Sequence, residues 1–285
     1  MNDSPAIIGL TLNFRDPART ETCVKSLLDD GAEHVLVWDN SDDAGCSAQA
    51  LQARLAGESR VTVEISPANL GFAAGVNRGI EAILARWPQT WVMLINNDAV
   101  LRPGALVALA DALREQPGAV VAYPRVDHGG QVTGTVYYQR VFALLRFDRP
   151  LPGSFPSPPG SALLIAPERI DLPLFDEDFF MYGEDVMLGW RLGAARMAHV
   201  PQVLAWHEGS ASSRNGSEFY EIRTAAGHWL LGRKLAHSPV DAGLLAAGRF
   251  FGLGARALVR ALRLRSLMPL RACAEGWRLA RQTGR

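Results

Sequence analysis

The sequence predicts an α/β protein with a doubly wound, mostly parallel sheet, followed by an amphipathic helical extension. Short apolar runs alternate with helical patterns over the first 125 residues. Hydrophobic residues make up 48% of the 285-residue chain, enough for a sizeable core. Charge is unevenly divided, because residues 1–232 carry 18 basic and 27 acidic side chains, whereas residues 233–285 carry 11 and 2. We therefore expect a main domain over 1–232 and a basic tail over 233–285.

Strands and helices of the main domain follow from the spacing of its apolar residues. Strands are expected at Ile7–Leu12, Val35–Trp38, Val61–Ile65, Trp91–Ile95 and Ala119–Tyr123. The first helix begins at Asp16-Pro17, a cap followed by a first-turn proline, and ends at Gly31. Two more helices are expected at Phe72–Trp87 and Pro103–Gln116. Strands flanked by such helices form a parallel sheet that binds ligands beyond the carboxyl ends of its strands.

The pattern is less regular after residue 125. A hairpin is expected around Gly129-Gly130, and five prolines between Pro150 and Gly160 predict a loop. Further expected elements are a strand Ser161–Ala166, a helix opening near Glu184, a strand Ala198–Val200 and a helix Ser217–Ala236.

The tail is expected to form one amphipathic helix over Asp241–Arg265 and a shorter one over Leu270–Arg281. In the first helix, the side chains of Arg249, Arg256, Arg260 and Arg263 fall within about 60° of each other. A separate apolar stripe contains Leu244, Phe251, Ala255, Leu258 and Leu262. The helix either docks on its own domain with a solvated arginine face or lies in a membrane interface.

Cysteine usage and charge limit the functional classes. The three cysteines lack a CxxC pairing, so neither a disulfide framework nor a zinc knuckle is indicated. The sequence begins without a secretory signal pattern, and no segment has the roughly 18 uncharged apolar residues that span a bilayer. A basic tail on an acidic body suits an anionic membrane surface better than nucleic acid. We expect a cytoplasmic protein without a nucleic-acid partner, peripheral at the inner face of the plasma membrane if the tail binds lipid.

Polar side chains follow two of the expected strands. Asn96-Asn97-Asp98 comes directly after Trp91–Ile95, where a carboxylate can bind a divalent cation that also holds a nucleotide diphosphate. Asp39 follows the second strand and can accept a hydrogen bond from a nucleobase imide or a ribose hydroxyl. Turn formation and helix capping are the alternative explanations for these residues.

Three further segments carry polar or glycine-rich patterns. Residues 69–79 read NLGFAAGVNRG, which matches neither the dinucleotide-binding nor the P-loop pattern, so its glycines indicate close helix packing or an anion site at a helix start. Residues 175–186 carry five carboxylates among aromatic side chains, and Glu184-Asp185 fall at a helix start whose dipole favours the ionised form needed in a general base. His207 follows a strand and could return to the edge near Asp98 as an auxiliary ligand, which would favour Mn²⁺ over Mg²⁺. Capping and structural roles are the alternatives.

Taken in order, five segments resemble the family-two inverting glycosyltransferases of the GT-A fold, especially their rhamnosyltransferase-like branch. The matching segments are VWDNS at 37–41, NLGFAAGVNRG at 69–79, NNDA at 96–99, FDEDFFMYGEDVMLGWR at 175–191 and HEGSAS at 207–212. Their order and spacing cover roughly residues 5 to 215, which is most of the expected main domain over 1–232, so this domain would be a GT-A glycosyltransferase domain.

The resemblance implies a role for each matching position. Asp185 would be the catalytic base with Glu184 beside it, and Asp98 and His207 would bind a divalent metal, Mn²⁺ or Mg²⁺. Nucleotide-binding positions would be Thr11, Asn13, Asp39, Asn69, Gly71, Asn77 and Asn97. Donor or acceptor pocket positions would be Asp178, Tyr182 and Arg191. Asn96 stands where other members carry the first acidic residue of the metal motif, so one negative charge is missing there.

The chemistry of inversion needs one in-line displacement, with one base for the acceptor hydroxyl and one cation for the leaving diphosphate. The resemblance implies a nucleotide-sugar donor, dTDP-L-rhamnose first, and a saccharide or lipid-linked saccharide of the cell envelope as acceptor. A sugar-phosphate nucleotidyltransferase is an alternative, although the loop at residues 11–16 lacks the glycine-rich pattern of that class. A catalytically degenerate sugar-nucleotide-binding module is another, and Asn96 is the feature in its favour.

Overall fold

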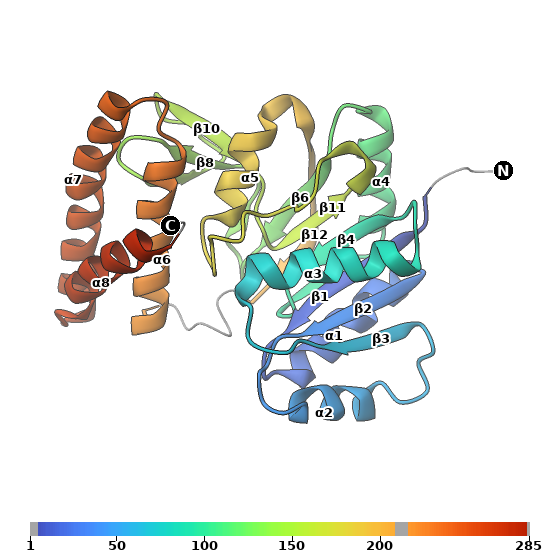
Figure 1. Ribbon diagram of the computed structural model, residues 1–285. Coiled ribbons are helices and arrows are strands. Elements are labelled where there is room, and N and C mark those ends of the chain that lie inside the picture. Colours follow the sequence, from blue (N-terminus) through green and yellow to red (C-terminus); the bar gives the residue numbers. More distant parts are fainter. Residues whose placement is uncertain (1–4, 209–215, 284–285) are drawn as a thin grey trace.

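The computed structural model describes residues 5–208 and 216–283, and Figure 1 shows their arrangement. Within these residues the main sheet has nine strands, in the order β3-β2-β1-β4-β11-β6-β12-β5, with β7 paired to β6. The strands are β1 (Ile7–Asn13), β2 (His34–Asp39), β3 (Val61–Ile65), β4 (Trp91–Ile95), β5 (Ala99–Leu101), β6 (Val121–Asp127), β7 (Val132–Thr133), β11 (Ala162–Ile165) and β12 (Met197–His207). β1 to β4 are parallel to one another, and β11 runs antiparallel to both β4 and β6.

Helices cover both faces of this sheet. One core lies between the sheet and α1 (Pro17–Asp29), α2 (Cys46–Arg54) and α4 (Ala105–Glu115). The other lies against α3 (Gly71–Arg86) and α5 (Glu184–Leu192). Alternate residues of β4 enter opposite cores, since Met93 belongs to the first and Val92 to the second. The predicted doubly wound α/β architecture is therefore confirmed.

Several elements of the main domain differ from the sequence predictions, and strand β5 is among those not predicted. The expected loop at 150–160 contains β10 (Ser154–Ser157), which joins β8 (Val136–Gln139) and β9 (Leu144–Phe147) in a small antiparallel sheet. Helix α2 was not predicted, because it begins after Gly45 without a side-chain cap and buries a single large apolar side chain, Leu51. The hairpin at Gly129-Gly130 is confirmed as the β6–β7 turn.

A helical layer follows the main sheet and packs beside the small one, on the left of Figure 1. It consists of α6 (Glu218–Lys234), α7 (Pro239–Leu264) and α8 (Met268–Gln282). Their shared core includes Leu231 of α6, Leu245 of α7 and Tyr138 of the small sheet. The domain boundary expected at residue 232 falls in the last turn of α6 and stays a prediction.

The orientation of α7 corrects the predicted solvated arginine face. Arg249 is fully buried and donates hydrogen bonds to the carbonyls of His228, Arg140 and Leu245. Small residues make the close contact, because a Cβ on Gly248 would come within 2.5 Å of Val141. The predicted apolar stripe instead faces outward, with relative exposures of 57% at Leu244, 68% at Phe251, 53% at Leu258 and 71% at Leu262. The helix docks on its own protein and still presents an apolar face to the exterior.

The sequence predicts no membrane-spanning segment, and one helix differs from this prediction by length and composition. Among the described residues, α7 is long and apolar enough to cross a bilayer by length and composition, and 28% of its most apolar window is buried. Arg249 in the middle of α7 binds backbone carbonyls of the protein, which ties this helix to the rest of the fold.

Candidate active site

The candidate site lies at the edge of the main sheet where β1, β2 and β4 end. Parallel pairing places Asn13 directly opposite Asp39, at the ends of β1 and β2. Antiparallel β11 begins at the same edge, since Ala162 pairs with Ile95 and the backbone N–H of Asn96 donates to the carbonyl of Ser161. Residues from four segments of the chain therefore meet at one edge, as expected of an open α/β sheet.

Asp39 is held in place by a buried polar network. Its Oδ1 accepts hydrogen bonds from Asn13 Nδ2 at 2.7 Å and from Ser41 Oγ at 2.6 Å. Thr20 Oγ1 donates to Asn13 Oδ1 at 2.8 Å and accepts from Asn97 Nδ2 at 3.1 Å. The network joins the ends of β1, β2 and β4 through α1, so three of the predicted nucleotide-binding residues share one rigid cluster.

Thr11 lies deeper than this network. It is fully buried within β1, and its hydroxyl accepts a weak hydrogen bond from the Cys23 thiol. Burial raises the pKa of this thiol to about 12, so it stays protonated. Thr11 thus sits inside the sheet beneath the edge where the proposed ligand-binding residues gather.

The start of α3 is shaped by Asn69 and Gly71. Asn69 Oδ1 accepts from the backbone N–H of Gly71, and Asn40 Nδ2 donates to the carbonyl of Gly71 at 2.9 Å. Gly71 has φ +80°, and a Cβ there would lie 2.4 Å from the carbonyl oxygen of Phe180. The N–H of Phe72 donates to that same carbonyl. A glycine is required here because the loop before α5 crosses directly over the helix start.

Asn77 secures the other end of this loop. Its side-chain Nδ2 donates to the carbonyl of Phe175 at 2.9 Å, and its Oδ1 accepts from the N–H of Phe175 at 3.0 Å. Nδ2 also donates to Glu177 Oε1. With its amide engaged on both sides and only 2% exposed, Asn77 positions the loop that leads to α5. Its predicted nucleotide-binding role would have to act through this loop.

Asp98 and His207 come together although 109 residues separate them in sequence. His207 Nε2 lies 2.9 Å from Asp98 Oδ1, and the N–H of Glu208 donates to the carbonyl of Asp98. On the other side of the ring, His207 Nδ1 lies 3.2 Å from His128 Nδ1. Burial lowers the pKa of His128, which favours a neutral ring beside His207.

The residues around this pair fit a divalent cation with few protein ligands. Buried Asn96 Oδ1 has no hydrogen-bond partner among the described residues, and its own Nδ2 lies 3.4 Å from His207 Nε2. One carboxylate, one imidazole and an unpaired amide oxygen suit Mn²⁺, or Mg²⁺ that retains waters and phosphate oxygens. Among residues 5–208 and 216–283, no group of three His, Cys, Asp or Glu side chains forms a closed metal site. Any ion here would keep open positions.

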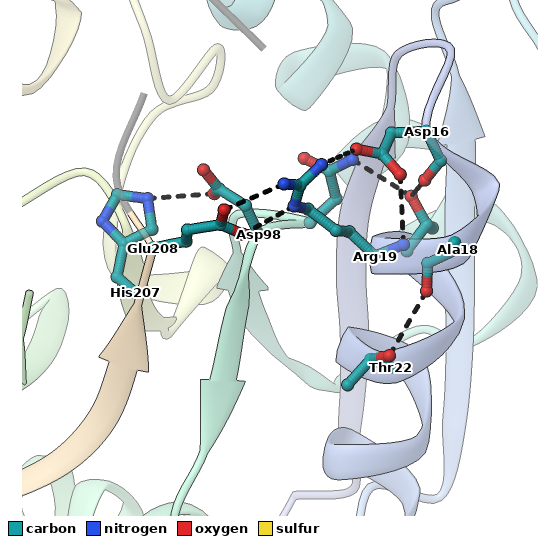
Figure 2. Close-up of polar contacts among 9 residues, drawn as sticks. Asp16, Ala18, Arg19, Thr22, Asp98, His207 and Glu208 are labelled. Carbon is teal, nitrogen blue, oxygen red and sulfur yellow. Dashed lines mark hydrogen bonds and ion pairs between the residues drawn. The ribbon is translucent and has the colours of Figure 1, made fainter. Parts of the chain in front are cut away.

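The guanidinium group of Arg19 lies beside the Asp98–His207 pair. Figure 2 shows Arg19, in the first turn of α1, reaching across to Glu208 next to Asp98 and His207. Its Nε and Nη2 form a two-pronged contact with the Glu208 carboxylate at 2.6 and 2.9 Å, and Nη1 contacts Asp16, the N-cap residue of α1. The two carboxylates raise the pKa of Arg19, so it stays charged. Arg19 therefore lies at the same sheet edge as Asp98 and His207.

Asp185 joins this edge through the β11 end. A Cβ on Gly160 would lie 3.3 Å from the Cβ of Asp185, and the next residue, Ser161, is bonded to Asn96. Asp185 Oδ1 accepts from the N–H of Val186 at 2.8 Å. Described contacts therefore link Asp185 to the strand end that carries Asp98.

Burial dominates the electrostatics of the carboxylate pair that opens α5. Desolvation and, second to it, the charge of the neighbouring Asp185 together raise the pKa of Glu184 to about 8. Burial also raises the pKa of Asp185. The helix dipole was expected to favour ionisation, and the structure corrects this expectation, because loss of hydration outweighs the dipole. A carboxylate whose pKa is raised toward neutrality is a stronger base for an alcohol proton.

The three predicted pocket residues have different surroundings. Tyr182, with φ +68°, packs edge-on against Tyr220 at 5.3 Å between ring centroids and lies three residues before Asp185. Asp178 pairs with Lys234 of α6 at 2.6 Å. Arg191 donates to the backbone carbonyls of Leu174 and Pro173, so its guanidinium is engaged in supporting the connection that precedes Asp185.

Sequence reasoning did not single out four residues that the structure brings to this site. These are Asn40, which bonds to the start of α3, His128 against His207, and the pair Arg19 and Glu208. Asn40 could have been found, since it follows Asp39 in the matching segment. Glu208 could have been found too, since it follows His207 in the matching segment HEGSAS. His128 and Arg19 depend on contacts between distant segments, and nothing in their local sequence marks them.

Comparisons with known proteins agree with this geometry. Residues 11–186, more than half of the chain, match the family described as Glycosyl transferase family 2. The chain belongs to glycosyl transferase family 2. The expected family resemblance is thereby confirmed, and the protein is a glycosyltransferase.

Relatives and solved structures refine the family assignment. The chain is 29% identical over 211 residues to the N-acetylglucosaminyl-diphospho-decaprenol L-rhamnosyltransferases of two Mycobacterium tuberculosis strains, CDC 1551 / Oshkosh and H37Rv, covering 63% of this chain and 67% of each relative. GalNAc-T7, crystallised with UDP, GalNAc and Mn²⁺, matches with a TM-score of 0.59 and 13% identity over 80% of this chain and 48% of its own. S. aureus TarS 1–349 matches with a TM-score of 0.54 and 12% identity over 97% of this chain and 90% of its own. These neighbours confirm the GT-A fold.

Proposed function

We propose that this family-two member is an inverting glycosyltransferase that moves a sugar from a nucleotide donor to a hydroxyl of a lipid-linked saccharide. The observation that carries the proposal is the contact of Asp98 with His207 at the sheet edge to which the partly buried Asp185 is linked through Gly160 and Ser161. An inverting displacement needs a base on one side of the anomeric carbon and charge neutralisation on the other.

In this mechanism Asp185 accepts the proton of the acceptor hydroxyl as that oxygen attacks the anomeric carbon. Asp98 and His207 would hold a divalent metal ion, which when bound neutralises charge on the leaving diphosphate. Arg19 lies beside the pair, and its charge is balanced by Asp16 and Glu208. Glu184, with its pKa raised to about 8 and its Oε2 unpaired among the described residues, keeps the environment of Asp185 poor in negative charge below that pH.

Donor binding is assigned to the edge formed by β1, β2 and the start of α3. Asp39 is proposed to recognise the nucleotide base, and its buried network fixes the orientation of its carboxylate. Asn69 and Gly71 shape the adjoining wall. The donor proposed first is dTDP-L-rhamnose, because the matched curated relatives are L-rhamnosyltransferases.

The acceptor is proposed to be lipid-linked, and the protein to work at the cytoplasmic face of a membrane. The matched relatives are named for a diphospho-decaprenol acceptor. The outer face of α7 carries exposed apolar side chains, including Leu258 and Leu262, beside basic ones. Leu145 and Phe147 of β9 are also exposed. A surface of this composition suits the interface of an anionic bilayer.

The proposal is tested by assaying purified protein against dTDP-, UDP- and GDP-sugars, with N-acetylglucosaminyl-diphospho-polyprenol as acceptor and Mn²⁺ present. The expected result is transfer from dTDP-L-rhamnose, with inverted anomeric configuration in the product and loss of transfer on chelation. Retained configuration would contradict the single-displacement mechanism. Full activity in excess chelator would contradict the metal role of Asp98 and His207.

A further inference from the structure

A groove that is separate from the candidate active site runs between α7 and the turn that joins β8 to β9. It is open along its length, encloses about 560 Å³ and is lined on its apolar sides by Phe142, Leu144, Phe251 and Val259. All four of these side chains are at least 41% exposed. The groove exists because Gly252 lets the turn approach α7, since a Cβ there would lie 2.2 Å from the carbonyl oxygen of Phe142.

Three arginines line one side of this apolar groove. Arg256 and Arg260 follow Gly252 at four-residue intervals along α7, and Arg263 completes the set. Glu221 of α6 pairs with Arg260. Neither Arg256 nor Arg263 has a carboxylate within ion-pairing distance among residues 5–208 and 216–283. An apolar channel bordered by uncompensated guanidinium groups matches a molecule that is an aliphatic chain at one end and an anionic phosphate at the other.

The arginine side of the groove adjoins the loop before α5. The Arg260 guanidinium lies 5.7 Å from the centroid of the Tyr220 ring, which contacts the ring of Tyr182 at 5.3 Å. Tyr182 lies three residues before Asp185 in sequence. These ring contacts connect the arginine side of the groove to the loop that leads to the proposed base.

We propose that this groove binds the lipid diphosphate of the acceptor, with Arg256 and Arg263 on the diphosphate and the Phe142–Phe251 side along the first part of the lipid chain. The inference rests on the proposed function, since it assigns a place to the acceptor of that reaction. It differs from attachment to the bilayer surface, because it requires one lipid diphosphate in a defined groove.

The direct test is binding of farnesyl diphosphate, a soluble C15 lipid diphosphate, measured by calorimetry with a chelator present to suppress binding at the metal site. Wild-type protein should bind it, and R256Q/R263Q should bind it about tenfold to a hundredfold more weakly, because two charge-assisted contacts are lost. The matched control is R271Q/R278Q, which removes two exposed arginines of the adjoining helix α8 and should change the affinity by less than twofold. Unchanged thermal unfolding of both variants verifies that they fold.

Unchanged affinity of R256Q/R263Q for farnesyl diphosphate would overturn the inference. It would also be overturned if this variant lost binding only to phosphatidylglycerol vesicles, because the arginines would then bind bilayer headgroups. In activity assays in neutral detergent, KM for N-acetylglucosaminyl-diphospho-polyprenol should rise at unchanged kcat, and transfer to octyl N-acetylglucosaminide, which lacks phosphate, should not change. Arginine-dependent binding of farnesyl diphosphate without transfer from any donor would contradict the proposed function and leave the groove assignment standing.

Discussion

Two regions differ in which side chains they bury: the edge of the main sheet that carries the candidate active site, and the outer face of α7. At the edge, polar groups such as Asn13 and Asp39 are almost fully buried and bonded to one another. On α7, apolar side chains such as Leu258 and Leu262 are exposed, while the charged Arg249 is buried. Buried polar groups need partners that fix their positions, whereas exposed apolar groups gain free energy only when something covers them.

The contrast corresponds to the two tasks of the proposed reaction, which are catalysis and capture of a lipid-linked acceptor. The edge is preorganised, since each predicted donor residue is held by contacts within the protein before any ligand arrives. The outer face of α7 instead exposes apolar side chains, which we propose a membrane covers. Substitutions at the edge should therefore change the chemical step, and those on α7 should change where the protein goes and what it captures.

The largest effect is expected from Asp185→Asn. Loss of the proposed base should lower kcat by about 10²–10⁴-fold, the range of general-base catalysis, while the donor dissociation constant stays nearly unchanged. Steady-state kinetics and calorimetric donor titration measure the two quantities. Asp171→Asn, an exposed carboxylate in the connection before α5, serves as the matched control and should keep wild-type kcat. Wild-type turnover of Asp185→Asn would remove this residue from its role.

Asp98→Asn should weaken the metal-dependent step by at least about 10²-fold, because the metal contribution to charge stabilisation amounts to several kcal/mol. His207→Asn should lose less, since the imidazole adds no negative charge. Activity is titrated against Mn²⁺ concentration for each variant. An Mn²⁺ dependence identical to wild type in both variants would refute the assignment of the pair.

The α7 face is tested by Leu258→Ser and Leu262→Ser together. Each exposed leucine that enters a bilayer interface contributes about 1.5–3 kcal/mol, so vesicle binding should fall at least about tenfold. Sedimentation with phosphatidylglycerol vesicles measures the change. Val107→Ser on α4 removes a side chain that is 62% exposed at another surface and should leave binding unchanged. Equal losses in both variants would deny α7 a special role.

Gly71→Ala should destabilise the fold by at least about 2 kcal/mol, since the added Cβ meets both a positive φ and the Phe180 carbonyl. Gly31→Ala is the matched control, because Gly31 has φ +105° with nothing within 4 Å of the added atom. It should lose only about 1 kcal/mol. Urea unfolding gives both free energies. Equal destabilisation would mean that the loop over α3 moves aside freely.

Glu184→Gln should alter the pH dependence of stability. The folded pKa of Glu184 is raised to about 8 from 4.5, so the folded state binds more protons between these values, and stability falls as pH rises through this window. The neutral glutamine removes that fall. Urea unfolding should show the variant gaining stability relative to wild type at pH 8 compared with pH 5. A constant difference at both pH values would contradict a buried, proton-binding Glu184.

Much of the fold could be predicted from sequence, because in its first half the spacing of apolar residues agrees with the capping, proline and glycine residues that bound each element. The predicted strand Trp91–Ile95 matches β4 residue for residue, and the helix expected at 72–87 corresponds to α3 at Gly71–Arg86. The orientation of α7 could not be predicted. Its contacts depend on Gly248 and Gly252 meeting a turn over 100 residues earlier in sequence, and on carbonyls that only the folded chain brings to Arg249.

The candidate site divides in the same way. Asp98 and Asp39 could be located because a residue following a strand of a parallel sheet lies at its ligand-binding edge. The proximity of Asp185 to this edge follows from the antiparallel pairing of β11 with β4. No local sequence pattern predicts that pairing. The raised pKa of Glu184 could not be predicted either, because sequence reveals the helix dipole and not the burial that outweighs it.

The most direct test of the account is the position of Mn²⁺ in crystals grown with Mn²⁺ and dTDP, located by anomalous scattering. The account predicts one strong peak in contact with Asp98 and His207 and with the diphosphate of the nucleotide, on the side of the sheet edge that carries Asp185. A fully occupied Mn²⁺–dTDP complex bound elsewhere on the protein, in crystals that still turn over donor and acceptor, would contradict it.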